Sequence, residues 1–297
     1  MSKTSLLKRL FKYKSGSIGL LIVVVLVGTA LLAPLIAPHD PFQQSLKKRL
    51  TPPSWMIGGD PQYLLGTDLI GRDILSRIIY GARVSLWVGV CTVALAGCFG
   101  VLLGLVGGYC GGKLDYWVLT LINMMWSFPF ILLALVIVAV LGTSLVNVII
   151  ALAATSWVSF ARIIRGEVMA IKAREFVQAE RALGAGGLRI MFRLILPNVS
   201  SSIFVLATIE FVRAIIRESF MSFLGVGVPP TVPSWGGMLA ESRAFMLVMW
   251  WLAAFPGLAI FFSALGVNLM GDGLRDLLDP RIRSKARYRN PRKDSPE

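Results

Sequence analysis

Hydrophobic residues in this chain gather into long runs that are separated by shorter polar stretches. A helix needs about 20 mostly apolar residues to cross the hydrocarbon core of a bilayer, and six runs approach or exceed that length. They extend approximately from Gly16 to Pro38, Val84 to Gly108, Trp117 to Leu141, Ser144 to Ala161, Val199 to Val228 and Met246 to Met270. The pattern predicts an all-α integral membrane protein with six transmembrane helices.

The composition agrees with a membrane protein. The 297 residues are 56% hydrophobic and 15% charged, whereas soluble domains are about 45–50% apolar. The first apolar run is too long for the core of a cleaved signal peptide and lacks a small-residue cleavage pattern, so we expect it to be retained. The net charge of +14 comes from basic residues at the two ends and in one internal segment, which does not indicate nucleic-acid binding.

The basic segments also predict an orientation. Lysine and arginine in short loops favour the cytoplasmic side of the membrane. With six spans, the amino end (1–15), the segment between the fourth and fifth runs (162–197) and the carboxyl tail (273–297) all fall on one side. We therefore expect both termini in the cytoplasm and the 39–80 segment outside the membrane on the opposite face.

Small residues recur at helical spacing in the second run. Gly100, Gly104 and Gly108 lie four residues apart, and Ala96 comes one step earlier. One helix face without large side chains would let another helix approach closely, which predicts a packing seam. Glycine is also common in membrane helices, so incidental glycines are the alternative.

The chain offers no recognisable catalytic or metal site. A nucleotide-hydrolysing subunit needs a phosphate-binding loop that ends in Gly-Lys-Ser or Gly-Lys-Thr, and the nearest string, residues 111–114, ends in leucine. His39 is the single histidine and is read as an interface residue. Cys91, Cys98 and Cys110 have no ligand-like spacing. We predict that this chain itself catalyses no reaction and binds no cofactor or metal.

The fifth apolar run is unusual because it carries four charged residues, Glu210, Arg213, Arg217 and Glu218. Glu210 lies about 18 Å along a helix from Asn198, at a rise of about 1.5 Å per residue. The first three share a helix face and can partly neutralise one another. Two interpretations stay open: an ion pair that locks neighbouring helices, or the polar lining of a translocation path.

A polar segment from Phe176 to Asn198 interrupts the apolar runs. Its pattern predicts two short helices, Ala173 to Ala182 and Leu188 to Leu196, which are joined by a glycine-rich turn and end at Pro197. Such a segment could dock a partner protein on the cytoplasmic face. An amphipathic segment that lies on anionic lipid headgroups is the alternative.

The same segment resembles the EAA loop of ABC importer permeases, in which Glu-Ala-Ala, a glycine and a final Ile-x-Leu-Pro occur at fixed spacing. The corresponding residues here are Gln178, Ala179, Glu180, Gly184, Leu194, Leu196 and Pro197. Gln178, Glu180 and Leu194 depart from the pattern, whereas Gly184 and the Leu-Pro pair match it. The resemblance implies that these residues couple the chain to an ATPase subunit.

Three further stretches resemble one branch of that family, the inner (C-type) permeases of dipeptide, oligopeptide and nickel importers. They are Leu65–Arg77, then Ser222–Gly225 together with Pro233–Leu239, and Asn268–Arg281. With the EAA-like loop, these stretches cover the chain from the outer loop to the start of the tail.

This resemblance implies a type I ABC importer permease fold and a bacterial inner-membrane location. It also implies a second homologous permease, two ATP-binding subunits that hold ATP and Mg, and an extracytoplasmic solute-binding protein. Di- or oligopeptides are the first substrate class, with nickel, glutathione-like peptides and other small solutes also open. In that family the EAA loop forms a coupling helix that inserts into a groove of the ATPase subunit.

On this interpretation the chain divides into five parts. They are a basic amino end (1–15), a first transmembrane helix (16–38), an extracytoplasmic loop (39–80), a five-helix permease domain (81–272, with its coupling loop at about 162–197) and a basic tail (273–297).

Two other classes of function remain as alternatives from the residues alone. A secondary transporter would show repeated halves or broken spans, and the sequence has no convincing repeat. A non-transporting membrane scaffold would be favoured if no ATPase subunit copurified with the chain.

Overall fold

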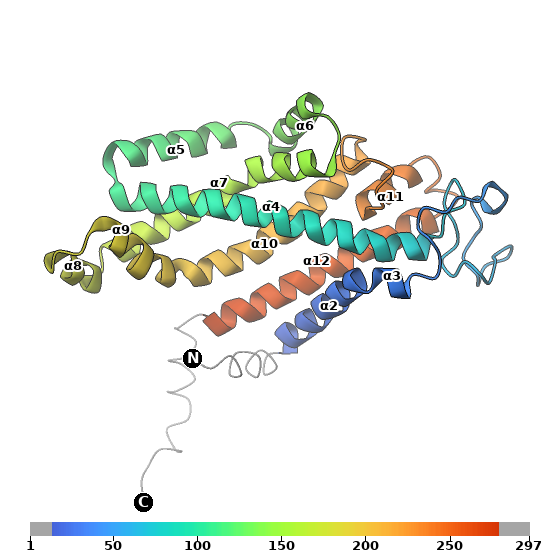
Figure 1. Ribbon diagram of the computed structural model, residues 1–297, viewed down its shortest axis with the longest axis horizontal. Coiled ribbons are helices and arrows are strands. Elements are labelled where there is room, and N and C mark those ends of the chain that lie inside the picture. The colour runs from blue at the N-terminus through green and yellow to red at the C-terminus, as the bar shows by residue number, and fades with distance from the viewer. Residues whose placement is uncertain (1–13, 279–297) are drawn as a thin grey trace, which may run out of the picture.

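The computed structural model describes residues 14–278, and the regular secondary structure in that range is helical (Figure 1). Both predicted basic ends fall largely in residues 1–13 and 279–297, outside the described residues, and the division into five parts stays a prediction. The helices are α2 (Lys14–Leu31), α3 (Ala33–Ile36), η1 (Leu46–Lys48), α4 (Ile74–Cys110), α5 (Gly112–Trp126), α6 (Phe130–Leu141), α7 (Leu145–Lys172), α8 (Glu175–Ala182), α9 (Gly187–Arg189), η2 (Ile190–Ile195), α10 (Leu196–Phe223), α11 (Trp235–Ser242) and α12 (Trp251–Leu278).

Four helical stretches are long and apolar enough to cross a membrane. They are α4, α7, the continuous helix Gly187–Phe223 and most of α12. Helices α5 and α6 pass the same test as a pair, although the chain bends by 87° between them, so the described residues give four or five candidate spans. The pattern predicted six, and the difference arises because the apolar part of α2, Ser15–Leu31, is a shorter helix.

The third predicted span is not one continuous helix. Helix α5 ends at Trp126 and α6 begins at Phe130, with Pro129 immediately before it. Proline disfavours helical geometry in the residue before it, and the backbone N–H of Ser127 closes α5 by donating to the carbonyl oxygens of Asn123 and Met124. The predicted span from Trp117 to Leu141 is thus two helices, because hydropathy does not register this break.

A second proline has the opposite outcome. The predicted short helix that ends at Pro197 is instead the beginning of the long helix Gly187–Phe223. Proline inside a helix clashes with the carbonyl group four residues back, and the chain widens into a π-helical turn, η2, just before it. There the N–H of Leu196 donates to the carbonyl oxygen of Met191, five residues back.

Helix α7 is also longer than predicted. The fourth apolar run ends near Ala161, yet α7 remains helical to Lys172. Arg162 and Arg165, which the sequence placed in the polar segment, therefore belong to this long helix. Arg165 is held there by a bidentate ion pair with Asp115 of α5, in which Nη2 lies 2.7 Å from Oδ2.

The packing seam predicted in α4 is confirmed, and its partner is α7. Methyl groups added to the three glycines would lie 2.4 to 2.8 Å from backbone carbonyl oxygens spaced four residues apart on α7. The facing pairs are Gly100 with Trp157, Gly104 with Ala161 and Gly108 with Arg165. Since no real Cβ atom tolerates such distances, glycine is required for the two backbones to come this close.

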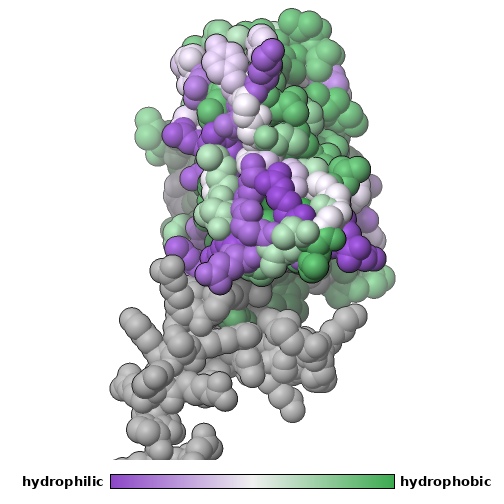
Figure 2. All heavy atoms as spheres, turned by 90° about the vertical axis from the view of Figure 1, so that its left-hand side faces the viewer, coloured by the Kyte–Doolittle hydropathy of each residue, from purple (hydrophilic) through white to green (hydrophobic). Residues whose placement is uncertain are grey.

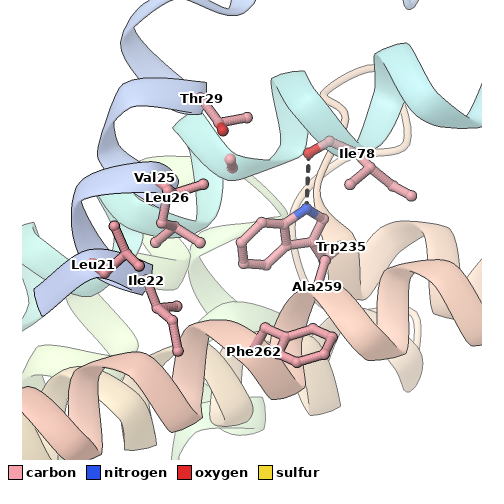
Figure 3. Close-up of a pocket in the computed structure, with 10 residues that line it drawn as sticks. Leu21, Ile22, Val25, Leu26, Thr29, Ile78, Trp235, Ala259 and Phe262 are labelled. Carbon is pink, nitrogen blue, oxygen red and sulfur yellow. Dashed lines mark hydrogen bonds between the residues drawn. The ribbon is translucent and has the colours of Figure 1, made fainter. Parts of the chain in front are cut away.

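Helices α2 and α12 lie side by side along one flank of the molecule (Figure 1). Together with α4 and α11 they surround an apolar groove of about 370 Å³ (Figure 3). Trp235 of α11 lines this groove, and its indole N–H donates to the carbonyl oxygen of Ile78 in α4, at 2.9 Å. This bond joins the short helix α11 to the start of α4.

The seam predicts different tolerance for two glycines on the same helix. A Cβ atom at Gly104 would lie 2.8 Å from the Ala161 carbonyl oxygen, whereas one at Gly97 would make only ordinary contacts of 3.6 Å with Phe160. We expect Gly104→Ala to lower the stability of the purified protein by about 1–3 kcal/mol, the usual cost of overpacking. Gly97→Ala should be nearly neutral. Thermal unfolding in detergent measures both, and equal melting temperatures for the two variants would contradict the seam.

Candidate functional site

The residues between α7 and α9 form a short helical projection, which we call the α8 segment (173–186). It lies at one end of the long axis, opposite α11 and the loop before α4 (Figure 1). Seen end-on, this part of the surface mixes hydrophilic and hydrophobic residues (Figure 2). The EAA-like segment is thus set apart from the apolar length of the long helices.

Gly184 has a conformational role in this segment. Its φ of +88° allows a Schellman turn, in which the N–H of Ala185 donates to the carbonyl oxygen of Glu180 and the N–H of Gly184 to that of Arg181, both at 3.0 Å. A side chain at Gly184 would meet no atom of this chain within 4 Å. The local reason for glycine is therefore the left-handed turn.

The α8 segment is fastened to three long helices. Val177 is 2% exposed and packs in one apolar cluster with Tyr109 of α4, Ile171 of α7 and Ile190 of η2. The ammonium group of Lys172 donates to the carbonyl oxygen of Tyr109 at 2.6 Å. A displacement of α8 would therefore act on the ends of α4, α7 and the long helix that contains α10.

The two halves of the EAA-like motif face in different directions. The exposed members are Gln178, Ala179, Gly184 and Pro197; the half-buried members are Glu180, Leu194 and Leu196. The side-chain amide of Gln178 donates to the carbonyl oxygen of Lys172 at 3.0 Å. Leu194 and Leu196 pack against the apolar cluster that holds Val177. The first half thus presents a surface, and the second half anchors it.

Large apolar side chains stand out from this polar end of the molecule. Leu183 is 83% exposed and Leu188 is 70% exposed, and they flank the glycine turn. Three arginines of the same stretch of chain, Arg174, Arg181 and Arg189, are also exposed. Exposed apolar side chains together with arginine are typical of protein-docking surfaces, and the sequence pattern alone did not single out these two leucines.

The charged residues of α10 form one ion-paired group. The side chain of Glu210 is fully buried, and its two oxygens lie 2.7 Å from Arg213 Nη1 and 3.4 Å from Arg217 Nη1. Arg217 also donates to the hydroxyl oxygen of Ser156 in α7 at 2.9 Å. Its guanidinium stacks 4.0 Å above the ring of Phe130 in α6. Glu210 thus holds two guanidiniums of α10, and Arg217 joins α10 to both α6 and α7.

Glu218 does not join this group. Its side chain is completely buried and accepts a hydrogen bond from the hydroxyl of Ser222 at 2.7 Å. No basic group of the described residues lies within ion-pair distance of it. One residue after Arg217, the helix has turned by about 100°, so Glu218 faces a different neighbour.

Sequence reasoning missed an ionic cluster at the opposite end of the molecule. Arg77 is 2% exposed at the start of α4, where it contacts Asp68 and forms a bidentate pair with Glu241 of α11 at 2.6 and 3.0 Å. Arg72 joins the same two carboxylates at 2.6 and 2.7 Å. The spacing of Asp68, Arg72 and Arg77 within Leu65–Arg77 was the available signal for their own pairing, but it does not point to Glu241.

The remaining candidate residues have structural surroundings. His39 Nδ1 lies 3.5 Å from Asp73 Oδ2, and its ring stacks on Tyr63. Cys91 is half-buried, whereas Cys98 and Cys110 are exposed, and all three are free thiols. Within residues 14–278 there is no group of three or more His, Cys, Asp or Glu side chains that could hold a metal ion.

Comparison with known proteins identifies the family to which this bundle of apolar helices belongs. Residues 100–284 match the family model described as "Binding-protein-dependent transport system inner membrane component", and residues 5–53 match "N-terminal TM domain of oligopeptide transport permease C". The chain belongs to this family of binding-protein-dependent inner-membrane transport components.

Curated relatives match along nearly the whole chain. A dipeptide transport system permease of Haemophilus influenzae is 46% identical over 92% of this chain and 93% of its own length. A di/tripeptide transport system permease of Pseudomonas aeruginosa is 44% identical over 93% of this chain and 91% of its own length. Among solved structures, the inward-facing MetNI methionine ABC transporter matches with a TM-score of 0.58 at 18% identity, covering 68% of this chain and 96% of that one.

These findings establish the protein as a membrane-spanning permease subunit of a bacterial ABC importer, with the type I permease fold. They replace the secondary-transporter and scaffold interpretations. A permease of this class works with a partner permease and with ATPase subunits.

The ion-paired group in α10 gives a second prediction. Glu210→Gln leaves the guanidiniums of Arg213 and Arg217 without their shared counter-ion, and loss of one partner from a buried pair costs about 3–5 kcal/mol. We expect a clear loss of folded complex, and partial recovery when Arg217→Met is added. Arg213→Gln should be milder because half of that side chain is exposed. Thermal unfolding of the four purified proteins tests this, and additive losses in the double variant would contradict the pairing.

Proposed function

We propose that this chain and a second, similar permease form the translocation path of an importer of dipeptides and short oligopeptides. The observation that carries the proposal is identity of 43 to 46% with relatives named as dipeptide or di/tripeptide permeases, over more than nine-tenths of both chains. The family resemblance also allows nickel, glutathione-like peptides and other small solutes as substrates. The names of these relatives favour peptides among these candidates.

Two ATPase subunits, which bind ATP and Mg, supply the energy in this proposal. One of them docks on the α8 segment, where Leu183 and Leu188 offer apolar anchors and the exposed arginines of the same stretch offer charge. Since Val177 ties α8 to α4, α7 and η2, closure of the ATPase pair would move the ends of these helices together. This rigid attachment favours a coupling role over an amphipathic helix that floats on headgroups.

The orientation follows from the docking surface. If α8 is cytoplasmic, the start of α2 and the end of α12 lie towards the same side, because both point to the α8 end of the molecule (Figure 1). We infer that α2, although short, is the sixth membrane pass, since it packs along the length of α12. Both termini would then be cytoplasmic.

The opposite end would receive the extracytoplasmic solute-binding protein. There the loop before α4 and the helix α11 are held together by the cluster of Arg77 with Asp68 and Glu241. A loop stabilised in this way offers a firm platform on which a binding protein can release its substrate.

A bulky residue on the docking surface tests the coupling role. Gly186 has ordinary extended geometry, and a side chain there would meet no atom of this chain within 4 Å. Gly186→Trp should therefore fold normally, yet obstruct the ATPase subunit. We expect at least a tenfold loss of labelled dipeptide uptake and reduced copurification of the ATPase subunits. The measurement uses proteoliposomes that contain the complete transporter and its binding protein.

The matched control is Gly28→Trp in α2, where a side chain also meets open space. It should leave uptake unchanged because an aromatic side chain on a membrane helix is readily accommodated. Unchanged uptake and ATP hydrolysis in Gly186→Trp would refute the coupling role. Failure of the wild-type transporter to import any dipeptide would refute the substrate class.

A further inference from the structure

A small polar pocket lies beside the bend between α5 and α6. It has a volume of about 270 Å³ and is lined by Trp126, Phe128, Phe130, Thr155, Ser159 and Arg217, among others. Pockets that enclose drug-sized ligands measure about 300–1,000 Å³. This pocket can therefore hold one end of a short peptide, but not a whole oligopeptide.

Arg217 enters the pocket as a positioned cation. Its Nη1 atom contacts Glu210 and Ser156, and the plane of its guanidinium rests on Phe130. Nε and Nη2 have no hydrogen-bond partner among residues 14–278. The hydroxyl of Ser159 is also without a partner in that part of the chain. The pocket thus contains fixed donors that are free to bind an acceptor.

The surroundings of the pocket carry excess positive charge. Among residues 14–278, Glu210 is the single carboxylate within ion-pair distance of Arg213 and Arg217. A third guanidinium, that of Arg162, lies 4.1 Å above the ring of Trp126 at the pocket wall. Three guanidiniums against one carboxylate make an anion the complementary ligand. Cations inside a membrane-spanning region face water or protein, so this face of α10 borders an aqueous path or another subunit.

We propose that this pocket binds the free C-terminal carboxylate of the transported peptide during its passage, with Arg217 as the carboxylate ligand. A planar guanidinium with two free donor atoms matches a carboxylate in a bidentate arrangement. The aromatic walls, Phe128 and Trp126, receive the last side chain of the peptide. This inference rests on the proposed function, since it takes a peptide as the substrate.

Photoaffinity labelling tests the site directly. The probe is a tritiated dipeptide of alanine followed by p-benzoylphenylalanine, applied at millimolar concentration to the purified transporter without its binding protein. We expect the label on residues 125–133, with competition by Ala-Phe but not by its C-terminal amide. Arg217→Gln should reduce this labelling at least tenfold, and Arg217→Lys less. The control Arg83→Gln, an exposed arginine of α4, should label as the wild type does.

A transport measurement separates a binding role from a structural one. In the complete reconstituted transporter, Arg217→Gln should lower kcat/KM for dipeptide uptake at least tenfold, while ATP hydrolysis stimulated by the binding protein stays within twofold. If Arg217→Gln fails to assemble, Phe128→Ala is the substitute variant. It removes an aromatic wall of the pocket without removing a charge, so it should weaken labelling by the aromatic probe.

Three results would overturn the inference. They are wild-type labelling that is absent from residues 125–133, labelling that the amide displaces as well as the acid does, and equal loss of uptake and hydrolysis in Arg217→Gln. Wild-type dipeptide uptake with full uptake by Arg217→Gln would refute this site and leave the proposed function standing. Absence of wild-type uptake would refute the proposed function itself.

Discussion

The close contact of the α4 and α7 backbones is the constraint on which the rest of the structure depends. Along Gly100, Gly104 and Gly108 no side chain separates the two helices, so they form one stiff unit. At one end of this unit Tyr109 packs against Val177 of α8, and the carbonyl oxygen of Lys172 accepts a hydrogen bond from Gln178. At the other end, Arg77 in the first turn of α4 pairs with Asp68 of the preceding loop and with Glu241 of α11. The two ends of the molecule are therefore connected through a rigid seam, as a transporter that couples them requires.

Charge inside the apolar region supplies a second constraint. Buried ionic groups are tolerated where their partners offset the free-energy cost of desolvation. The two buried glutamates of α10 have different kinds of partner. Glu210 is shared between two arginines, whereas Glu218 is surrounded by hydroxyl groups and has no cation within ion-pair distance in the described chain. Only the first arrangement leaves donor groups free, which is why the proposed peptide contact lies beside Arg217.

Much of the fold could be predicted from the sequence because its signals are local. Hydropathy located the long helices, glycine spacing found the seam, and the spacing from Glu210 to Arg217 placed those charges on one face. The two prolines show the limit: Pro129 accompanies a break, whereas Pro197 is absorbed by a π-helical turn. Which outcome occurs depends on tertiary packing. The cluster of Arg77 with Glu241 joins residues far apart in sequence, so no local pattern could pair them.

Chemical crosslinking at Leu183 tests the central claim, that the α8 segment is the joint with the ATPase subunit. In a transporter whose three native cysteines are replaced by serine, Leu183→Cys is compared with Leu247→Cys, which is 97% exposed next to α11 at the opposite end. The account predicts that a short thiol-to-amine reagent joins the ATPase subunit to Leu183→Cys, with a yield that changes on ATP binding, and not to Leu247→Cys. A transport-competent complex that crosslinks the ATPase subunit at position 247 but not at 183 would contradict it.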